Sequence, residues 1–239
     1  KTAYEISTRD WSSDVCSSDL IDGEVARTRS RPIPSGQVTV AQARLFLALQ
    51  ALVGLAVLLA FDRFSIVLGV SSLAVVAIYP FMKRVTDWPQ AFLGLAFSWG
   101  ALMGWAATFH RLDLPPVILY VGCVLWTIGY DTIYAHQDKE DDAIVGVRST
   151  ARLFADHTRG WLIALYGATV VLFALALTLA GAGAFAFAGL FAFAGHLVWQ
   201  IRCLDVDDPD LCLALFRSNR EAGWLLFAGL VLDAARGLV

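Results

Sequence analysis

The chain has 239 residues, of which 58% are hydrophobic and 16% are charged, and its mean hydropathy is +0.63. Soluble domains are typically about 45–50% apolar and about 25% charged, so this composition excludes a disordered chain, a collagen, a coiled coil and almost any water-soluble enzyme. The formal net charge of −3 argues against nucleic acid as a partner. We therefore expect an all-α fold, a polytopic helical bundle in a lipid bilayer.

The first twenty residues differ from the rest of the chain. They are polar and contain a near-repeat, Ser12–Val15 and Ser17–Leu20, and the character of the sequence changes abruptly at Ile21. We interpret residues 1–20 as a non-native or disordered tail, similar to the translated adapter sequence found at the ends of assembled sequencing fragments. Residues 21–239 form the membrane domain in this interpretation.

Seven stretches qualify, or nearly qualify, as membrane-spanning helices, which need about 20 apolar residues. Several are joined by only a few residues, which predicts antiparallel neighbours in one bundle, and they lack the alternation typical of membrane β-strands. The predicted spans are residues 43–61, 64–82, 89–109, 115–135, 160–180, 183–201 and 222–236.

Basic residues gather on one side of these spans. If the segment before residue 43 is cytoplasmic, thirteen Lys and Arg residues lie on the cytoplasmic side and only Arg63, Arg111 and Arg236 lie on the opposite side. The positive-inside rule then places every long polar loop in the cytoplasm. We expect a multi-pass protein of a bacterial inner membrane, with its active-site loops on the cytoplasmic side.

An acid-rich segment, residues 130–154, begins at the end of the fourth span. On a continuing helix its polar residues recur at i, i+3, i+7, i+10 and i+11, which places them on one face. Carboxylates four residues apart destabilise a helix, so the cluster indicates a bound cation, and oxygen ligands without His or Cys favour Mg²⁺. A solvated acidic loop is the alternative. The residues are Asp131, Tyr134, Asp138, Asp141 and Asp142.

A basic segment, residues 21–36, lies on the same side of the membrane. Asp22 precedes Arg27, Arg29 and Arg31, and a Pro-Ile-Pro-Ser-Gly break follows before the next helix. Guanidinium groups that face an acidic loop suit the recognition of a polyanion such as diphosphate. Positive-inside topology by itself also explains these arginines, so both interpretations stay open.

These two segments resemble the motifs of the UbiA superfamily of intramembrane prenyltransferases, within it the 4-hydroxybenzoate polyprenyltransferases of ubiquinone biosynthesis. Family members carry NDxxDxxxD followed by RTRxRP, matched here by Asp22 and residues 27–32. They also carry DxxYxxxDxxDD followed by GxRSTA, matched by residues 131–142 and Arg148. Segments 79–84, 89–107, 196–201 and 215–224 resemble the hydroxybenzoate subgroup.

The resemblance implies transfer of a polyprenyl group from polyprenyl diphosphate to the ring carbon ortho to the hydroxyl of 4-hydroxybenzoate. It implies Mg²⁺ as cofactor, neutralising the diphosphate before the allylic C–O bond ionises. The implied metal ligands are Asp22, Asp138, Asp141 and Asp142. The implied diphosphate ligands are Arg27, Arg29, Arg31 and Arg148.

Two residues are the candidates for catalysis. Tyr134 would stabilise the allylic cation through a cation–π contact, and Asp131 would either stabilise that cation or accept the ring proton. The hydroxybenzoate carboxylate needs a cationic partner, for which Lys83 and Arg84 are the candidates. The long isoprenoid tail would lie between helices, which explains why such an enzyme is built inside a membrane.

The chain departs from the family pattern at its start. Family members have nine spans and this chain shows seven, and only the last Asp of the first motif is matched, by Asp22. We therefore expect a fragment that lacks upstream helices and part of the metal site, with little or no activity as it stands.

Two alternatives to the hydroxybenzoate enzyme remain. One is a UbiA-type enzyme with another acceptor, such as homogentisate, naphthoate, a glyceryl phosphate, chlorophyllide or haem. The other is a cation-coupled transporter, which requires acidic residues near the middle of the membrane. The acidic residues 138–142 are instead expected at a helix end or beyond it.

Overall fold

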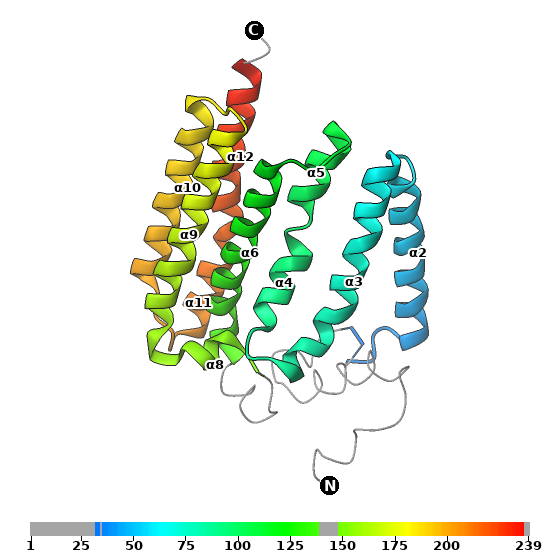
Figure 1. The fold of residues 1–239 in the computed structure, drawn as a ribbon. Coiled ribbons are helices and arrows are strands. Elements are labelled where there is room, and N and C mark those ends of the chain that lie inside the picture. The colour runs from blue at the N-terminus through cyan, green and yellow to red at the C-terminus, as the bar shows by residue number, and fades with distance from the viewer. Residues whose placement is uncertain (1–31, 34, 139–147, 237–239) are drawn as a thin grey trace. The chain divides into compact units, whose positions relative to one another are not determined.

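The computed structural model describes residues 32–33, 35–138 and 148–236, without the side chains of Lys83, Arg84 and Asp138. Every regular element in these ranges is helical, which confirms the all-α prediction (Figure 1). The chain divides between residues 60 and 61 into two units, each of which is described by itself.

The first unit contains one described helix, α2 (Val40–Leu58). It begins three residues before the expected span because Thr39 and Gln42 form a capping box. The backbone N–H of Thr39 donates to Gln42 Oε1 at 2.9 Å, and the N–H of Gln42 donates to Thr39 Oγ1 at 3.3 Å. No residue of α2 is buried, which suits a helix with an apolar surface in contact with lipid.

The second unit is a bundle of helices that run back and forth between two ends (Figure 1). One end, called the motif end below, is where α3, α6 and α10 finish and where α4, α9 and α12 begin. The elements are α3 (Arg63–Val85), α4 (Pro89–Phe97), α5 (Gly100–Phe109), α6 (Leu114–Ala135), η2 (His136–Asp138), α8 (Thr150–Phe154), η3 (Ala155–His157), α9 (Thr158–Leu179), α10 (Ala184–Cys203), α11 (Pro209–Arg217) and α12 (Asn219–Arg236).

Helix α6 is central to this unit and packs mainly against α9. Glycines on α6 make the close approach possible, because a Cβ at Gly122 would lie 2.7 Å from the Phe173 ring and a Cβ at Gly129 would clash with the Tyr166 ring. Both rings are buried in the main hydrophobic cluster. Small residues therefore bring two helices together here, as is typical of bundles in lipid.

The predicted span 89–109 consists of two helices, α4 and α5, separated at Ser98 and Trp99. At the break the backbone changes from i+4 to i+3 hydrogen bonding, since the N–H of Trp99 bonds to Ala96 O at 3.4 Å. The carbonyl of Leu95 instead accepts the Tyr120 hydroxyl at 2.9 Å, and the Trp99 indole N–H donates to Leu68 O at 3.1 Å. Neighbouring helices thus satisfy the interrupted backbone, as membrane helices require.

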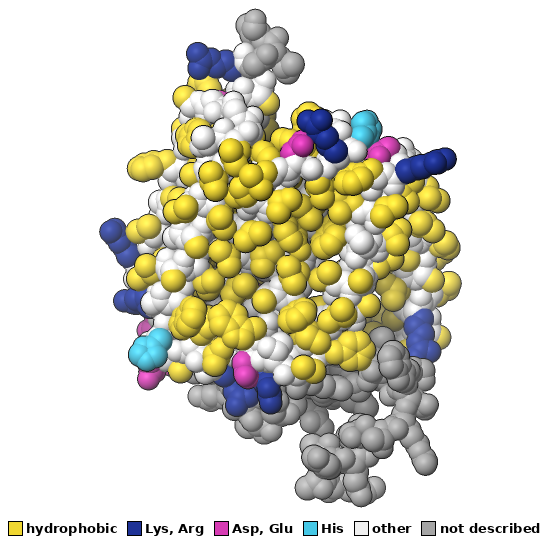
Figure 2. All heavy atoms as spheres, in the orientation of Figure 1, with side chains coloured by type: hydrophobic (Ala, Val, Ile, Leu, Met, Phe, Trp, Pro, Cys, Tyr) yellow, Lys and Arg dark blue, Asp and Glu magenta, His cyan; other side chains and the backbone are white. Residues whose placement is uncertain are grey.

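Six segments of the described residues are long and apolar enough to cross a membrane: Val40–Leu58, Arg63–Met82, Pro89–Phe109, Leu114–Ala135, Thr150–Leu179 and Ala184–Cys203. These match the first six predicted spans. The seventh predicted span, 222–236, forms helix α12. This helix contains four charged residues and is not among the six apolar segments. Hydrophobic side chains cover the middle of the face in Figure 2, and charged side chains lie toward the two ends.

At the end opposite the motif end, aspartate side chains accept hydrogen bonds from backbone N–H groups where helices begin. Asp62 accepts the N–H groups of Phe64 and Ser65 and lies 3.1 Å from Nδ1 of His110. Hydrogen bonds from the Ser65 hydroxyl and then from His110 lower the pKa of Asp62 to about 2. Asp233 of α12 similarly accepts the N–H of Gly183 at 2.6 Å, where α10 begins. These contacts tie neighbouring helices together at their ends.

Candidate active site

The end of α6 carries the two candidate catalytic residues. Asp131 and Tyr134 lie in the last two turns of α6 and are both half-buried. The Asp131 carboxylate interacts electrostatically with the hydroxyls of Tyr130, on the same helix, and Tyr79, on α3. The motif end therefore gathers a carboxylate and tyrosine hydroxyls from two helices, α3 and α6, that are not consecutive in the chain.

Aromatic rings line α6 beside this carboxylate. Trp126, Tyr130 and Tyr134 recur every four residues and so share one face of the helix. The Tyr134 ring centroid lies 4.4 Å from that of Phe216 on α11, at an interplanar angle of 38°. The Trp126 indole N–H donates to Asn219 Oδ1 at 2.9 Å, which holds the start of α12 against the same face. These contacts pack the aromatic face of α6 against α11 and α12.

The prediction of one continuous α-helical face through residue 142 is wrong. Helix α6 ends at Ala135, and His136–Asp138 form a 3₁₀ turn. The Gln137 side-chain amide donates to Tyr134 O at 3.0 Å, and His136 Nε2 lies 3.1 Å from Thr158 Oγ1 on α9. These bonds accompany the end of the α-helical register after Ala135, and repulsion between carboxylates four residues apart also disfavours its continuation.

Arg148 belongs to the acid-rich segment and is the residue at which the described chain resumes after residue 138. Its Nη1 donates to Val85 O, the last residue of α3, at 3.3 Å, and its Nε lies 3.9 Å from Asp87 Oδ1. Both side chains of that ion pair are about half exposed, so the pair contributes little stability. The guanidinium is thus held at the motif end by weak contacts that leave it accessible.

Residues 149–154 are anchored more firmly than Arg148 itself. Thr150 is fully buried, its N–H donates to Gln90 Oε1 at 3.1 Å, and its hydroxyl lies 2.6 Å from the Thr132 hydroxyl. Phe154 stacks on Trp161 with ring centroids 4.6 Å apart and meets the edge of Trp88 at 5.3 Å. None of Gln90, Thr132 and Thr150 was predicted from the sequence as a site residue.

The structure does not describe the side chains of the other predicted site residues. Lys83 and Arg84 belong to the last turn of α3 at the motif end, but their side chains are not described. Asp138 closes the 3₁₀ turn, also without a described side chain. The remaining predicted ligands, outside the described residues altogether, are Asp22, Arg27, Arg29, Arg31, Asp141 and Asp142.

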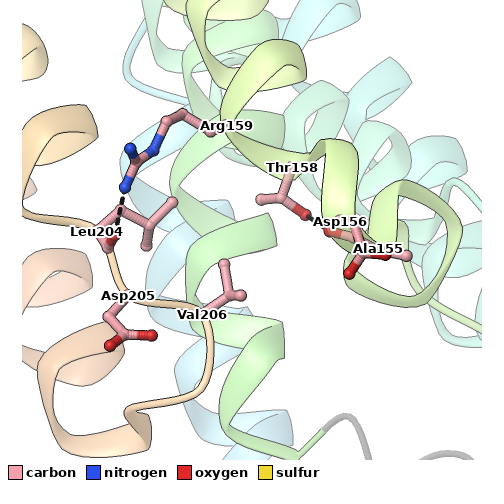
Figure 3. Close-up of a pocket in the computed structure, with 7 residues that line it drawn as sticks. All are labelled: Ala155, Asp156, Thr158, Arg159, Leu204, Asp205 and Val206. Atoms are coloured by element: carbon pink, nitrogen blue, oxygen red, sulfur yellow. Dashed lines mark hydrogen bonds between the residues drawn. The ribbon is translucent and has the colours of Figure 1, made fainter.

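A polar hollow of about 460 Å³ opens at the motif end, between the start of α9 and the α10–α11 connection (Figure 3). Arg159 points to Leu204, whose carbonyl accepts a hydrogen bond from Nη2 at 2.8 Å, and Asp156 and Asp205 lie on its two sides. The hollow contains neither Asp131, Tyr134 nor any other predicted ligand.

An apolar cavity of about 620 Å³ lies between α5, α6, α9 and α12. Its α6 residues, Pro115, Pro116 and Leu119, belong to the first turns of that helix, whereas Asp131 belongs to the last turns. Twelve residues of helix separate Leu119 from Asp131, a rise of about 18 Å. The apolar cavity and the polar motif end thus lie at different depths along one helix.

The sequence and the fold of the chain both resemble those of known proteins. The UbiA prenyltransferase family matches residues 19–231. The chain belongs to this family. It is similar to proteins named "4-hydroxybenzoate polyprenyltransferase, mitochondrial", with 47% identity to that of Aedes aegypti, 48% to that of Arabidopsis thaliana and 44% to that of Homo sapiens. The alignments cover 88–89% of this chain but only 48–57% of those proteins, so the chain spans about half the length of the curated relatives it matches.

Two solved structures share the fold. The apo structure of a UbiA homolog from Aeropyrum pernix K1 aligns with a TM-score of 0.78 and 23% identity, covering 92% of this chain and 82% of the other. A digeranylgeranylglyceryl phosphate synthase aligns with a TM-score of 0.65 and 18% identity, covering 93% and 82%. At these identities the likeness concerns the fold, and it confirms the UbiA-like bundle expected from the sequence.

Proposed function

We propose that the protein transfers a polyprenyl group from polyprenyl diphosphate to 4-hydroxybenzoate, at the ring carbon ortho to the hydroxyl, in ubiquinone biosynthesis. The observation that carries the proposal is the 44–48% identity, over nearly nine-tenths of the chain, to proteins of that name. Because the chain spans about half of those relatives, the activity is proposed for the complete gene product. The inactivity expected of the 239-residue chain alone stays a prediction.

The two ends of α6 support this choice of substrate. Polyprenyl diphosphate has a charged head and a long hydrocarbon tail, and the second unit has polar groups around Asp131 and an apolar cavity that begins about 18 Å away along α6. We assign the head to the motif end and the tail to the cavity, where Phe173 and Leu177 of α9 form part of the apolar wall.

The chain's own residues are assigned roles that suit their positions. Arg148, together with Arg27, Arg29 and Arg31, binds the diphosphate, for which guanidinium groups are well suited. Tyr134 presents its ring to the allylic cation. Asp131 stabilises the same cation or accepts the proton that leaves the ring carbon when the new C–C bond forms. The carboxylate of 4-hydroxybenzoate is assigned to Lys83 or Arg84, in the last turn of α3.

Mg²⁺ belongs to this proposal as the cofactor. Carboxylate oxygens are the donors that Mg²⁺ prefers, which suits an acid-rich segment in donor chemistry. The described residues contain no group of three or more His, Cys, Asp or Glu side chains that could hold a metal. The proposed ligands are those that the resemblance implies, and their side chains lie outside the described part of the chain: Asp22, Asp138, Asp141 and Asp142. A bound ion would neutralise the diphosphate and make it a better leaving group.

The other hypotheses are less well supported. A transporter requires carboxylates in mid-membrane. Asp62 and Asp113 instead directly precede α3 and α6, and Asp131 lies four residues from the end of α6. A different acceptor remains the second candidate, because the UbiA fold also serves a digeranylgeranylglyceryl phosphate synthase. Identity to the hydroxybenzoate enzyme of Aedes aegypti is 47%, against 18% to that synthase.

An acceptor assay tests the proposal. The complete gene product, in detergent or in membranes, is supplied with a polyprenyl diphosphate, Mg²⁺ and one acceptor at a time: 4-hydroxybenzoate, homogentisate or a dihydroxynaphthoate. We expect prenylated 4-hydroxybenzoate as the only product, and loss of product when EDTA replaces Mg²⁺. Product from another acceptor alone, or turnover that persists in EDTA, would refute the acceptor or the cofactor assignment respectively.

The protein is a multi-pass membrane protein. Which membrane it spans, and in which orientation, belongs to the proposal. The names of the curated relatives place those proteins in mitochondria, which disagrees with the bacterial inner membrane expected from the sequence. We propose that the motif end faces the compartment where biosynthesis of the soluble acceptor takes place. Cys203 is exposed at that end, so its labelling by a membrane-impermeant maleimide from one side only would establish the orientation.

A further inference from the structure

Side-chain hydrogen bonds hold the chain where it leaves α6, the departing end, and where it returns to α8, the returning end. At the departing end, His136 is buried and its Nε2 lies 3.1 Å from Thr158 Oγ1. At the returning end, Ser149 caps α8 by accepting the N–H of Arg152 at 3.4 Å.

Three polar residues join the returning end to two other helices. Gln90 lies in the first turn of α4, Thr132 near the end of α6 and Thr150 at the start of α8, and their exposed fractions are 5%, 0% and 0%. Gln90 Oε1 accepts the N–H of Thr150 at 3.1 Å, and the two threonine hydroxyls are 2.6 Å apart. We call these residues the 90–132–150 cluster.

The 90–132–150 cluster is adjacent in sequence to two proposed site residues. Thr132 directly follows Asp131, and Thr150 comes two residues after Arg148. The Arg148 side chain in turn reaches Val85 O, just before the loop that leads to Gln90. The cluster therefore connects the backbone that carries the candidate catalytic carboxylate to the backbone that carries the candidate diphosphate ligand.

Attachment of α8 alone does not require a buried amide, because Phe154 already packs against Trp88 and Trp161. Apolar packing tolerates small sliding movements, whereas a hydrogen bond to one N–H defines a direction and a register. Burying polar groups is costly unless they are bonded, and a satisfied buried network specifies one arrangement. The position of Gln90 thus indicates a requirement for accurate placement.

We propose that Gln90 is a positioning residue for recognition of the diphosphate group. By holding the first N–H of α8, Gln90 sets where Arg148 lies relative to Asp131. Gln90 itself does not touch the substrate. This inference rests on the proposed function above and deepens it.

The test compares two substitutions of Gln90 in the complete gene product. Gln90→Met keeps the length of the side chain but removes the acceptor, and Gln90→Glu keeps an acceptor oxygen. We expect Gln90→Met to raise KM for polyprenyl diphosphate about tenfold while KM for 4-hydroxybenzoate stays within twofold, and Gln90→Glu to restore most of the loss. One hydrogen bond has this order of effect.

A double substitution and a matched control separate positioning from general stability. In an Arg148→Ala background, Gln90→Met should change KM for the diphosphate substrate less than twofold, because the group that Gln90 positions is gone. Gln200→Met is the control, since Gln200 is another fully buried glutamine, whose amide bonds to Leu215 O and Ser218 Oγ. It should lower thermal stability without raising this KM.

Several results would overturn the inference. These are a KM for polyprenyl diphosphate unchanged in folded Gln90→Met protein, a full tenfold effect that persists without Arg148, or an equal effect in Gln200→Met. If Gln90→Met does not fold, Thr132→Val, which removes one hydroxyl of the same cluster, replaces it with the same expected result.

Failure of the proposed function is recognised separately, by the absence of 4-hydroxybenzoate prenylation in the unsubstituted protein. Calorimetric binding of inorganic diphosphate with Mg²⁺ then replaces KM as the readout. Weaker binding in Gln90→Met than in Gln90→Glu would still support the positioning role, and equal binding would refute it.

Discussion

Substitution of Gly229 by alanine tests the closest helix packing in the bundle. Gly229 of α12 faces Gly189 of α10, and both are in helices that contact each other along their length. A Cβ added at Gly229 would lie 2.6 Å from Gly189 Cα and 2.7 Å from Phe185 O. Both neighbours are backbone atoms, so a side-chain rotation cannot relieve the contact.

The magnitude follows from how far the helices must separate. Reaching an ordinary contact distance of 3.4 Å requires a movement of about 0.8 Å, and gaps of about 0.5–1 Å forfeit a quarter to a half of each dispersion contact nearby. Overpacking of this kind costs about 1–3 kcal/mol. The greater helix propensity of alanine offsets up to about 1 kcal/mol, so the net loss in the free energy of unfolding should be about 1–2 kcal/mol.

Thermal unfolding in detergent, followed by the fluorescence of the eight tryptophans, measures this loss. Gly195→Ala is the matched control, because it makes the same chemical change on α10 where a Cβ meets nothing within 4 Å. At about 2–4 °C per kcal/mol, Gly229→Ala should unfold several degrees below the parent protein, and Gly195→Ala at or slightly above it. Equal unfolding temperatures for the two variants would refute the packing argument.

Three further outcomes are expected. Tyr134→Phe should keep the rate of prenyl transfer within about threefold because the ring remains, whereas Tyr134→Leu should lose at least tenfold; equal losses would contradict a cation–π role. Asp142→Ala should abolish Mg²⁺-dependent transfer in the complete gene product, and retained activity would remove the residue from the metal site. Asp62→Asn should lower the unfolding temperature at neutral pH, because hydrogen bonds from Ser65 and then His110 lower the pKa of Asp62 from 3.8 to about 2. A carboxylate with a lowered pKa stabilises the fold above about pH 4, and this stabilisation is lost as the pH falls toward 2. The difference in unfolding temperature between variant and parent should therefore shrink at pH 3. A difference that stays constant with pH would argue against a stabilising role of the Asp62 carboxylate.

The span predictions succeeded where a continuous apolar run was enough to define a helix. Helix α6 was expected at 115–135 and forms Leu114–Ala135, because a run of this length must hydrogen-bond within itself in lipid. The break between α4 and α5 could not be predicted in the same way. It depends on hydrogen bonds from Trp99 to Leu68 and from Tyr120 to Leu95, which connect residues 31 and 25 positions apart.

The site could be predicted only in part, for a similar reason. Asp131 and Tyr134 stand out through local spacing, and the structure places both at the end of α6. The α-helical register beyond Ala135 was wrong because spacing alone does not reveal that His136 is bonded to α9. The Gln90–Thr150 contact joins residues 60 positions apart, and nothing in the sequence around either residue indicates the other.

The break between α4 and α5 separates residues at the motif end from residues that line the apolar cavity, which a single straight helix would join rigidly. Helix α4 carries Gln90 at the motif end, whereas Gly100, Gly104 and Trp105 of α5 line the apolar cavity. Trp99 donates to Leu68 O of α3, Tyr120 donates to Leu95 O of α4, and the two rings meet edge to face with centroids 5.8 Å apart. The junction is thus held by contacts with α3 and α6. Under the proposed function, substitutions of the α5 residues that line the cavity would change the accepted tail length while Gln90 keeps its contact with Thr150 at the motif end.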